Sequence, residues 1–133
     1  MILKSTSVLI NENQENIFLF LSDSSNLFHI LPKESISDWK ANLTECSFKV
    51  QGGVVISLVQ DGFEGKSKIF MKSGEKSPFP FKLTLNLEKI ENQTQGYIEF
   101  DGELNKFLKM MVEKPLTNLF NYMSEKLKTH FEH

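Results

Sequence analysis

Apolar and polar positions alternate with a period of two through the middle of the chain, from about residue 37 to residue 104. The alternation is clearest at Phe81, Leu83, Leu85 and Leu87, which are separated by polar or charged residues. This pattern predicts a strand with one face buried and the other in water. Similar patterns predict five further strands, at 2–10, 38–50, 54–60, 64–73 and 96–104. Because short polar segments connect consecutive strands, we expect antiparallel neighbours.

Glycines and breaks in the alternation indicate where these strands end or bend. Gln51-Gly52-Gly53 and Asp61-Gly62 predict tight turns, and residues 74–78 and 91–95 predict loops. Within 38–50 the apolar parity changes between Leu43 and Cys46, which indicates a β-bulge.

A helical period appears in the last quarter of the chain, at residues 104–131, where Asn105 is a suitable N-cap. The apolar side chains fall on one face of this helix: Leu108, Val112, Leu119 and Met123, with Met111, Leu116 and Tyr122 beside them. Pro115 lacks an N–H and predicts a kink, with two separate helices as the alternative.

The part of this helix before Pro115 is apolar nearly all round. Phe107 and Met110 point away from the main apolar face. We therefore expect something other than the sheet to cover them: the apolar turn at 27–31, a ligand or a second subunit. As adaptable apolar side chains, Met110 and Met111 with Phe107 could also line a pocket, although core packing is the commoner role.

Two short helices are expected between the first two strands. Ile17, Phe18, Phe20 and Leu21 form the first apolar group, and residues 27–31 form the second, which ends at Pro32. Both Asn11 and Asn13 can cap the first of them. Asn11 is favoured because Gln14 follows three residues later, as in a capping box.

Composition narrows the class of protein. The 133 residues predict one domain, 1–133, and the formal net charge is −2. All 15 basic residues are Lys, scattered along the chain, so no nucleic-acid partner is expected. The single Cys46 excludes an intramolecular disulfide. No apolar run reaches the roughly 18 residues of a membrane span, and the N-terminus is a poor signal peptide, so we expect a cytoplasmic protein without an integral membrane segment.

The order of elements, together with residues 16–23, Leu31-Pro32, Trp39 and above all 104–116, resembles the START-like superfamily, also called SRPBCC. This superfamily includes the birch-pollen-allergen family and the polyketide cyclase-like proteins. The resemblance implies an α+β helix-grip fold, in which a curved antiparallel sheet of about six strands wraps around a long C-terminal helix. It also implies a cavity between sheet and helix for an apolar small molecule or lipid. It implies no reaction, since members include carriers, ring hydroxylase subunits, cyclases and chaperone co-factors.

Few side chains suggest chemistry. His29 could act as an acid or base at a cavity mouth, or could simply be a surface residue, whereas His130 and His133 belong to the tail. No cofactor is expected, and scattered His residues without carboxylates at ligand spacing predict no metal site. The chain also lacks the paired Cys and His residues of Rieske subunits. Gly52-Gly53 lacks the pattern of a phosphate-binding loop.

Most charged residues are interpreted as solvated. Glu99, Asp101 and Glu103 alternate with apolar residues and predict a water-facing strand face rather than a catalytic pair. Lys66, Lys68 and Lys72 share one parity and should also face water, although inside a cavity they could neutralise an acidic head group. Cys46 is expected to be a small buried thiol rather than a nucleophile.

Together these observations predict a protein, monomer or homodimer, that binds an apolar or amphipathic small molecule or lipid without catalysis. Its expected ligand-binding residues are Leu83, Leu85, Phe100, Leu108, Met111, Leu119 and Met123. One alternative is a polyketide cyclase or dehydratase-like enzyme, which requires an ionisable side chain in the cavity. Another is a protein-interaction module like the chaperone co-factors, which predicts an exposed apolar patch near Phe107 and Met110.

Overall fold

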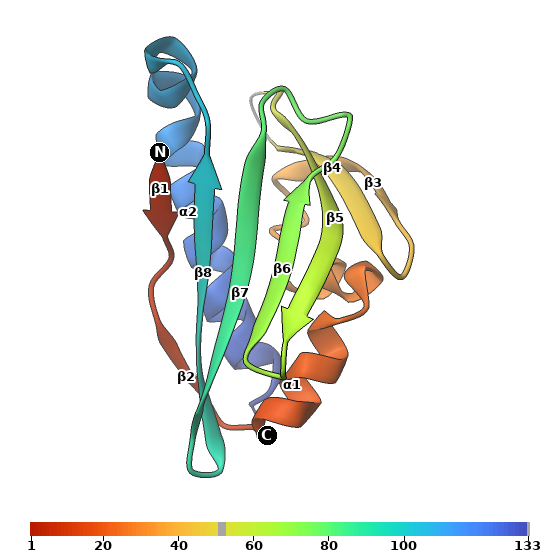
Figure 1. Cartoon of the computed structure of the whole chain (residues 1–133), viewed down its shortest axis with the longest axis vertical. Coiled ribbons are helices and arrows are strands. Elements are labelled where there is room, and N and C mark those ends of the chain that lie inside the picture. Colours follow the sequence, from red (N-terminus) through yellow and green to blue (C-terminus); the bar gives the residue numbers. More distant parts are fainter. Residues whose placement is uncertain (51–52, 133) are drawn as a thin grey trace.

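An eight-stranded antiparallel sheet curves around one long helix in the computed structural model, which describes residues 1–50 and 53–132 (Figure 1). The strands are β1 Ile2–Lys4, β2 Val8–Ile10, β3 Ile36–Ala41, β4 Glu45–Val50, β5 Val55–Glu64, β6 Lys68–Ser73, β7 Phe81–Ile90 and β8 Gln93–Gly102. The helices are α1 Gln14–Leu21, the 3₁₀ helix η1 Ser24–Ile30 and α2 Lys106–His130. Neighbouring strands follow the order β1-β8-β7-β6-β5-β4-β3, and β2 also pairs with β8. The predicted α+β helix-grip architecture is confirmed.

Two of the six expected strands are each divided, which accounts for the total of eight in the described residues. The segment 2–10 is interrupted at Ser5, whose Oγ accepts a hydrogen bond from the Ile98 N–H at 2.8 Å. The segment 38–50 contains a hairpin turn instead of the expected bulge. There the Asn42 Oδ1 accepts hydrogen bonds from the N–H groups of Thr44 and Glu45, both at 3.0 Å. This side-chain cap turns the backbone between β3 and β4, and the turn explains the change of apolar parity.

The prediction of a turn at Asp61-Gly62 is also wrong. Both residues lie inside β5, where the register against β6 shifts between Gln60 and Phe63. Gly62 has φ +105, a backbone angle that suits a bulge as well as a turn. The presence of glycine in the sequence therefore could not distinguish a bulge from a turn. The chain reverses later, at Gly65, which has φ +53. The turn expected at Gln51-Gly52-Gly53 falls partly outside the described residues.

The longest ladder of the sheet joins β7 and β8, from Phe81 opposite Gly102 to Ile90 opposite Gln93. The loop expected at 91–95 is therefore only a short turn at Glu91 and Asn92, and Glu91 has φ 57. The clean alternation at 81–87 is confirmed, because Phe81, Leu83, Leu85 and Leu87 are all buried.

The helical segments lie close to their expected positions, although α1 and η1 follow the second strand, β2, because the first was divided. The N-cap of α1 is Asn13, whose Oδ1 accepts a hydrogen bond from the Asn16 N–H at 2.9 Å. Asn11 is therefore not the cap. Gln14, the reason for favouring Asn11, uses its Nε2 to donate to the Leu87 carbonyl at 2.7 Å, so its side chain serves tertiary packing instead of a capping box.

The long helix α2 begins as expected, with the Asn105 Oδ1 accepting from the Leu108 N–H at 2.9 Å. Pro115 lies inside one continuous helix, so two separate helices are excluded. The helix crosses the concave side of the sheet, and its carboxyl end lies beside α1 (Figure 1). In the described part of the chain, no helix is both long enough and apolar enough to cross a bilayer.

Candidate functional site

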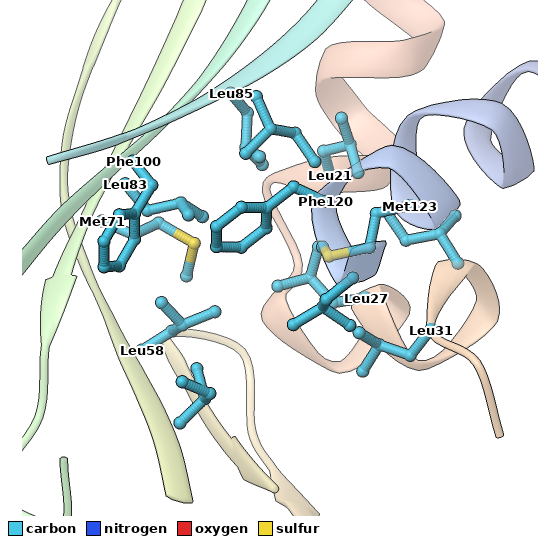
Figure 2. Close-up of a cluster of buried hydrophobic side chains, with 14 of the residues drawn as sticks. Leu21, Leu27, Leu31, Leu58, Met71, Leu83, Leu85, Phe100, Phe120 and Met123 are labelled. Carbon is cyan, nitrogen blue, oxygen red and sulfur yellow. The ribbon is translucent and has the colours of Figure 1, made fainter. Parts of the chain in front are cut away.

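Five of the seven predicted ligand-binding residues meet between the sheet and α2. Leu83, Leu85, Phe100, Leu119 and Met123 are all at most 4% exposed. Figure 2 shows side chains from the sheet, among them Leu83 and Phe100, and side chains from α2, Phe120 and Met123, pointing into one cluster.

The other two predicted residues differ from each other. Leu108 is half-buried and packs against the core, whereas Met111 is 54% exposed. Met111 is about 100° around the helix from Val112, which is 1% exposed and marks the side that packs on the sheet. The prediction that Met111 lines the wall between sheet and helix is therefore wrong. This half of α2 carries apolar side chains on several sides, but only one side packs on the sheet.

The space between sheet and helix is filled by side chains. Phe120 of α2 packs against Phe100 of β8 with tilted rings whose centroids are 5.5 Å apart, and Phe100 in turn packs against Phe81 at 5.1 Å. A gap of about 10 Å³ remains beside these rings, lined also by Phe48 and Leu119. A volume of this size holds about one water molecule. In this conformation the interior is a packed core rather than an open cavity.

An open groove of about 510 Å³ lies beside α2, at its middle turns. Its walls come from three segments: the connection from η1 to β3 (Pro32, Ser35), the end of β4 (Val50) and α2 (Lys114, Pro115, Asn118, Leu119, Tyr122). Ligand sites usually measure about 300–1,000 Å³, so the groove is large enough for a small molecule. Leu119 lines both this groove and the small interior gap, and it is therefore the residue that separates them.

The groove combines apolar and polar walls. Pro32, Val50 and Pro115 supply apolar surface, whereas Lys114, Asn118 and Tyr122 carry polar ends. Lys114 takes part in none of the ion pairs found among residues 1–50 and 53–132. Its ammonium group is thus available to an anion, and the arrangement suits a molecule with an apolar body and an acidic end.

Sequence reasoning missed Pro32, Ser35, Val50 and Asn118 as wall residues of this groove. They are distant in sequence, and neither their type nor their spacing distinguishes them. Three wall residues did give a local signal: Leu119 and Tyr122 belong to the predicted apolar face of the helix, and Pro115 is a proline inside it.

His29 and His130 lie away from the groove. Both are exposed, and their rings stack at the carboxyl end of α2 with centroids 5.9 Å apart. Phe20 of α1 lies against His130 at 4.5 Å. Burial, then the neighbouring His29 and Lys126, lower the pKa of His130. His133 is outside the described residues. Among the described residues, no three His, Cys, Asp or Glu side chains are grouped as a metal site would need.

Four of the remaining charged candidates are exposed, as expected, and the other two, Glu99 and Lys68, are half-buried. Glu99 pairs with Lys4 at 3.6 Å on the outer side of the sheet, and Asp101 and Glu103 are exposed. Lys72 pairs with Asp61 at 3.8 Å, and Lys66 pairs with Glu15 at 2.9 Å.

Cys46 is buried, as expected. Desolvation, and secondly the charge of Glu45, raise the pKa of its thiol to about 12. Such a thiol carries almost no thiolate near pH 7 and cannot serve as a nucleophile there.

Comparison with solved structures agrees with the observed architecture. A START superfamily protein from Mycobacterium smegmatis is 12% identical with a TM-score of 0.74, and the match covers 98% of this chain and 96% of that one. The solution structure of KanY protein is 17% identical with a TM-score of 0.78, covering 100% and 98%. The protein TTHA0849 from Thermus thermophilus is 13% identical with a TM-score of 0.77, covering 98% and 97%.

At these identities the likeness concerns the fold. The chain has the helix-grip fold of these structures, which confirms the fold that the resemblance implied. Neither a protein-family model nor a curated protein sequence matches it.

Proposed function

We propose that the protein binds an amphipathic small molecule or lipid with an acidic group, using the groove beside α2. The observation that carries the proposal is the position of Leu119, which lies at the inner wall of the groove and at the edge of the interior gap. A ligand whose acidic end meets Lys114 would direct its apolar body toward Leu119. Displacement of that side chain would let the apolar body reach the ring of Phe48 and the other residues of the gap.

A packed interior is compatible with this function only if binding rearranges side chains. Met123 and Leu119 border the gap. The phenylalanine rings beside them occupy the space where a cavity was predicted. Met is adaptable because its side chain is unbranched. The proposed binding therefore opens space in the apolar layer instead of filling a preformed cavity, and it should be weaker than binding to a preformed site.

An enzyme of the cyclase or dehydratase type has little support in the described part of the chain, because the ionisable side chains of the groove, Lys114 and Tyr122, are both exposed. No Asp, Glu, His, Lys or Tyr side chain of the described residues is buried, and their one buried ionisable group is the Cys46 thiol. We therefore propose binding and no reaction.

The test is a titration of delipidated protein with a fluorescent fatty acid, supported by native mass spectrometry. Asn118→Trp places an indole in the exposed wall of the groove and should weaken binding about tenfold or more, because it occupies the space of the ligand. Thr117→Trp, one position earlier and outside the groove walls, is the matched control and should leave binding unchanged. Lys114→Gln should weaken binding of the fatty acid but not of the corresponding alcohol. Equal binding by Asn118→Trp and Thr117→Trp would exclude the groove.

A further inference from the structure

We propose that the amino-terminal end of α2 is a docking surface for an anionic lipid membrane. This surface, here called the α2 tip, comprises residues 106–111. The proposal stands independently of the ligand groove, because it rests on different side chains.

Exposed apolar side chains gather on the α2 tip. Phe107 is 70% exposed, Met110 is 76% exposed and Met111 is 54% exposed. On a helical projection of about 100° per residue, these three lie within a sector of roughly 100°. Val112 and Leu116, which are buried against the sheet, lie on the opposite side of the helix. The tip therefore presents a second apolar face, directed away from the core.

No other part of the described chain covers this face. The first turns of α2 extend past β1 and β8 (Figure 1). The apolar turn around Leu27, which the sequence offered as one possible cover, is itself buried elsewhere in the core. Three exposed side chains at one helix end are fewer than the roughly 20–30 residues that each partner contributes to a standard protein interface. A small projecting apolar end is better matched to a lipid surface, which a few inserted side chains can enter.

The charge around the tip favours an anionic surface. Lys106 and Lys109 are exposed, and no acidic residue lies between Leu104 and Val112. Neither Lys is in an ion pair within the described residues. Glu103 and Glu113 flank this stretch, and the whole chain carries a net charge of −2. Because the protein as a whole is repelled by an anionic membrane, attraction confined to the tip would orient it with Phe107 and Met110 toward the lipid.

The backbone at the tip adds to this local positive potential. The first turn of α2 contains no acidic side chain, so the positive end of the helix dipole is not neutralised there. Lysine stems can lie along apolar surface while their ammonium groups reach the lipid phosphates. The α2 tip thus combines exposed apolar side chains with two exposed lysines: on the helical projection Lys106 lies next to Met110, and Lys109 lies on the other side of the helix.

The test is flotation of the full chain with vesicles of phosphatidylcholine alone and with equimolar phosphatidylcholine and phosphatidylglycerol. We expect binding to the anionic vesicles only, and its loss between about 0.01 M and about 1 M salt, where the Debye length falls from ~30 to ~3 Å. Phe107→Ser/Met110→Ser should reduce partitioning about tenfold or more. Lys106→Gln/Lys109→Gln should reduce it by about fivefold per Lys.

Matched controls remove equivalent groups elsewhere. Leu19→Ser/Leu43→Ser deletes two side chains that are 58% and 63% exposed, and Lys82→Gln/Lys89→Gln deletes two exposed charges of β7. Both controls should bind vesicles as the parent does, and all variants should keep the parent's thermal unfolding midpoint. Absence of parental binding, or equal loss in the controls, would overturn the proposal. So would self-association in light scattering that disappears in Phe107→Ser/Met110→Ser, because a second copy would then cover the tip.

Discussion

Gly102 occupies the last position of β8, where the chain leaves the sheet toward α2. A Cβ at this position would lie 2.7 Å from the Leu104 Cδ1 and 2.7 Å from two atoms of the Phe100 ring. Phe100 is fully buried and packs against the ring of Phe120, so its own ring has little room to move. The absence of a side chain at residue 102 therefore allows the central aromatic contact between sheet and helix.

We expect Gly102→Ala to lower the free energy of unfolding by roughly 1–3 kcal/mol, because it overpacks this contact. Urea denaturation provides the measurement. Gly96→Ala, also in β8, is the control: its nearest neighbour would be the Ile10 Cδ1 at 3.2 Å, the end of a side chain that can shift. A loss at Gly102 no larger than the loss at Gly96 would show that the aromatic contact is not constrained as described.

Gln60 is a second residue whose role depends on three-dimensional contacts. Its Nε2 donates to the carbonyl of Ser22 and lies 3.3 Å from both the Ser24 Oγ and the Leu43 carbonyl. One side chain thus joins β5 to the end of α1, the start of η1 and the turn before β4. Nothing in the sequence around Gln60 indicates this role, since each partner is distant along the chain.

At the scale of elements, the start of α1 shows how a local rule can be overridden. Asn11 and Asn13 are both good N-caps by residue type. Asn13 is the cap for two reasons. The Gln14 side chain donates a hydrogen bond to the Leu87 carbonyl of β7, and the Glu12 carboxylate accepts one from the Asn13 N–H at 2.9 Å. Tertiary contacts therefore select the helix start.

Asn13→Ala should reduce stability by about 1 kcal/mol, since it leaves the Asn16 N–H without its partner. Asn11→Ala should change stability by less than about 0.5 kcal/mol, because Asn11 is exposed and precedes the cap. Thermal or urea unfolding of the two variants measures these changes in stability. The reverse ranking would place the cap at Asn11.

At the scale of the whole molecule, the carboxyl end of α2 is held against α1 and η1 by aromatic contacts. His130 contacts both Phe20 of α1 and His29 of η1. The pKa of His130 is lowered in the folded state by burial, His29 and Lys126. The unfolded chain, with a pKa of about 6.5, therefore binds more protons than the folded chain as the solution is acidified.

It follows that the contribution of His130 to stability is complete above its unfolded pKa and decreases as pH falls through its lower folded pKa. His130→Gln should show a smaller loss of urea stability than the parent between about pH 8 and about pH 5. Groups elsewhere contribute equally to both proteins and cancel in the difference. Identical pH dependence in parent and variant would contradict a lowered pKa for His130.

The sequence by itself determined the strand-forming segments, the long helix with its Asn105 cap, and the inward parity of 81–87, whereas the helix-grip fold was what the resemblance of the element order implied. These features arise from local chemistry: an alternation of apolar residues, a helical period and a capping side chain act within a few residues of one another. It also indicated that Phe107 and Met110 would point away from the sheet, which the exposed α2 tip confirms.

Tertiary structure alone decided how the apolar side chains are used. The residues at 83, 85, 100, 119 and 123 do face one another, yet Phe120 and its neighbours fill the space that the sequence pattern left undefined. A pattern specifies which side chains point inward, but packing depends on their volumes and on the curvature of the sheet. The groove beside α2 likewise required three distant segments to meet, and no local rule encodes that meeting.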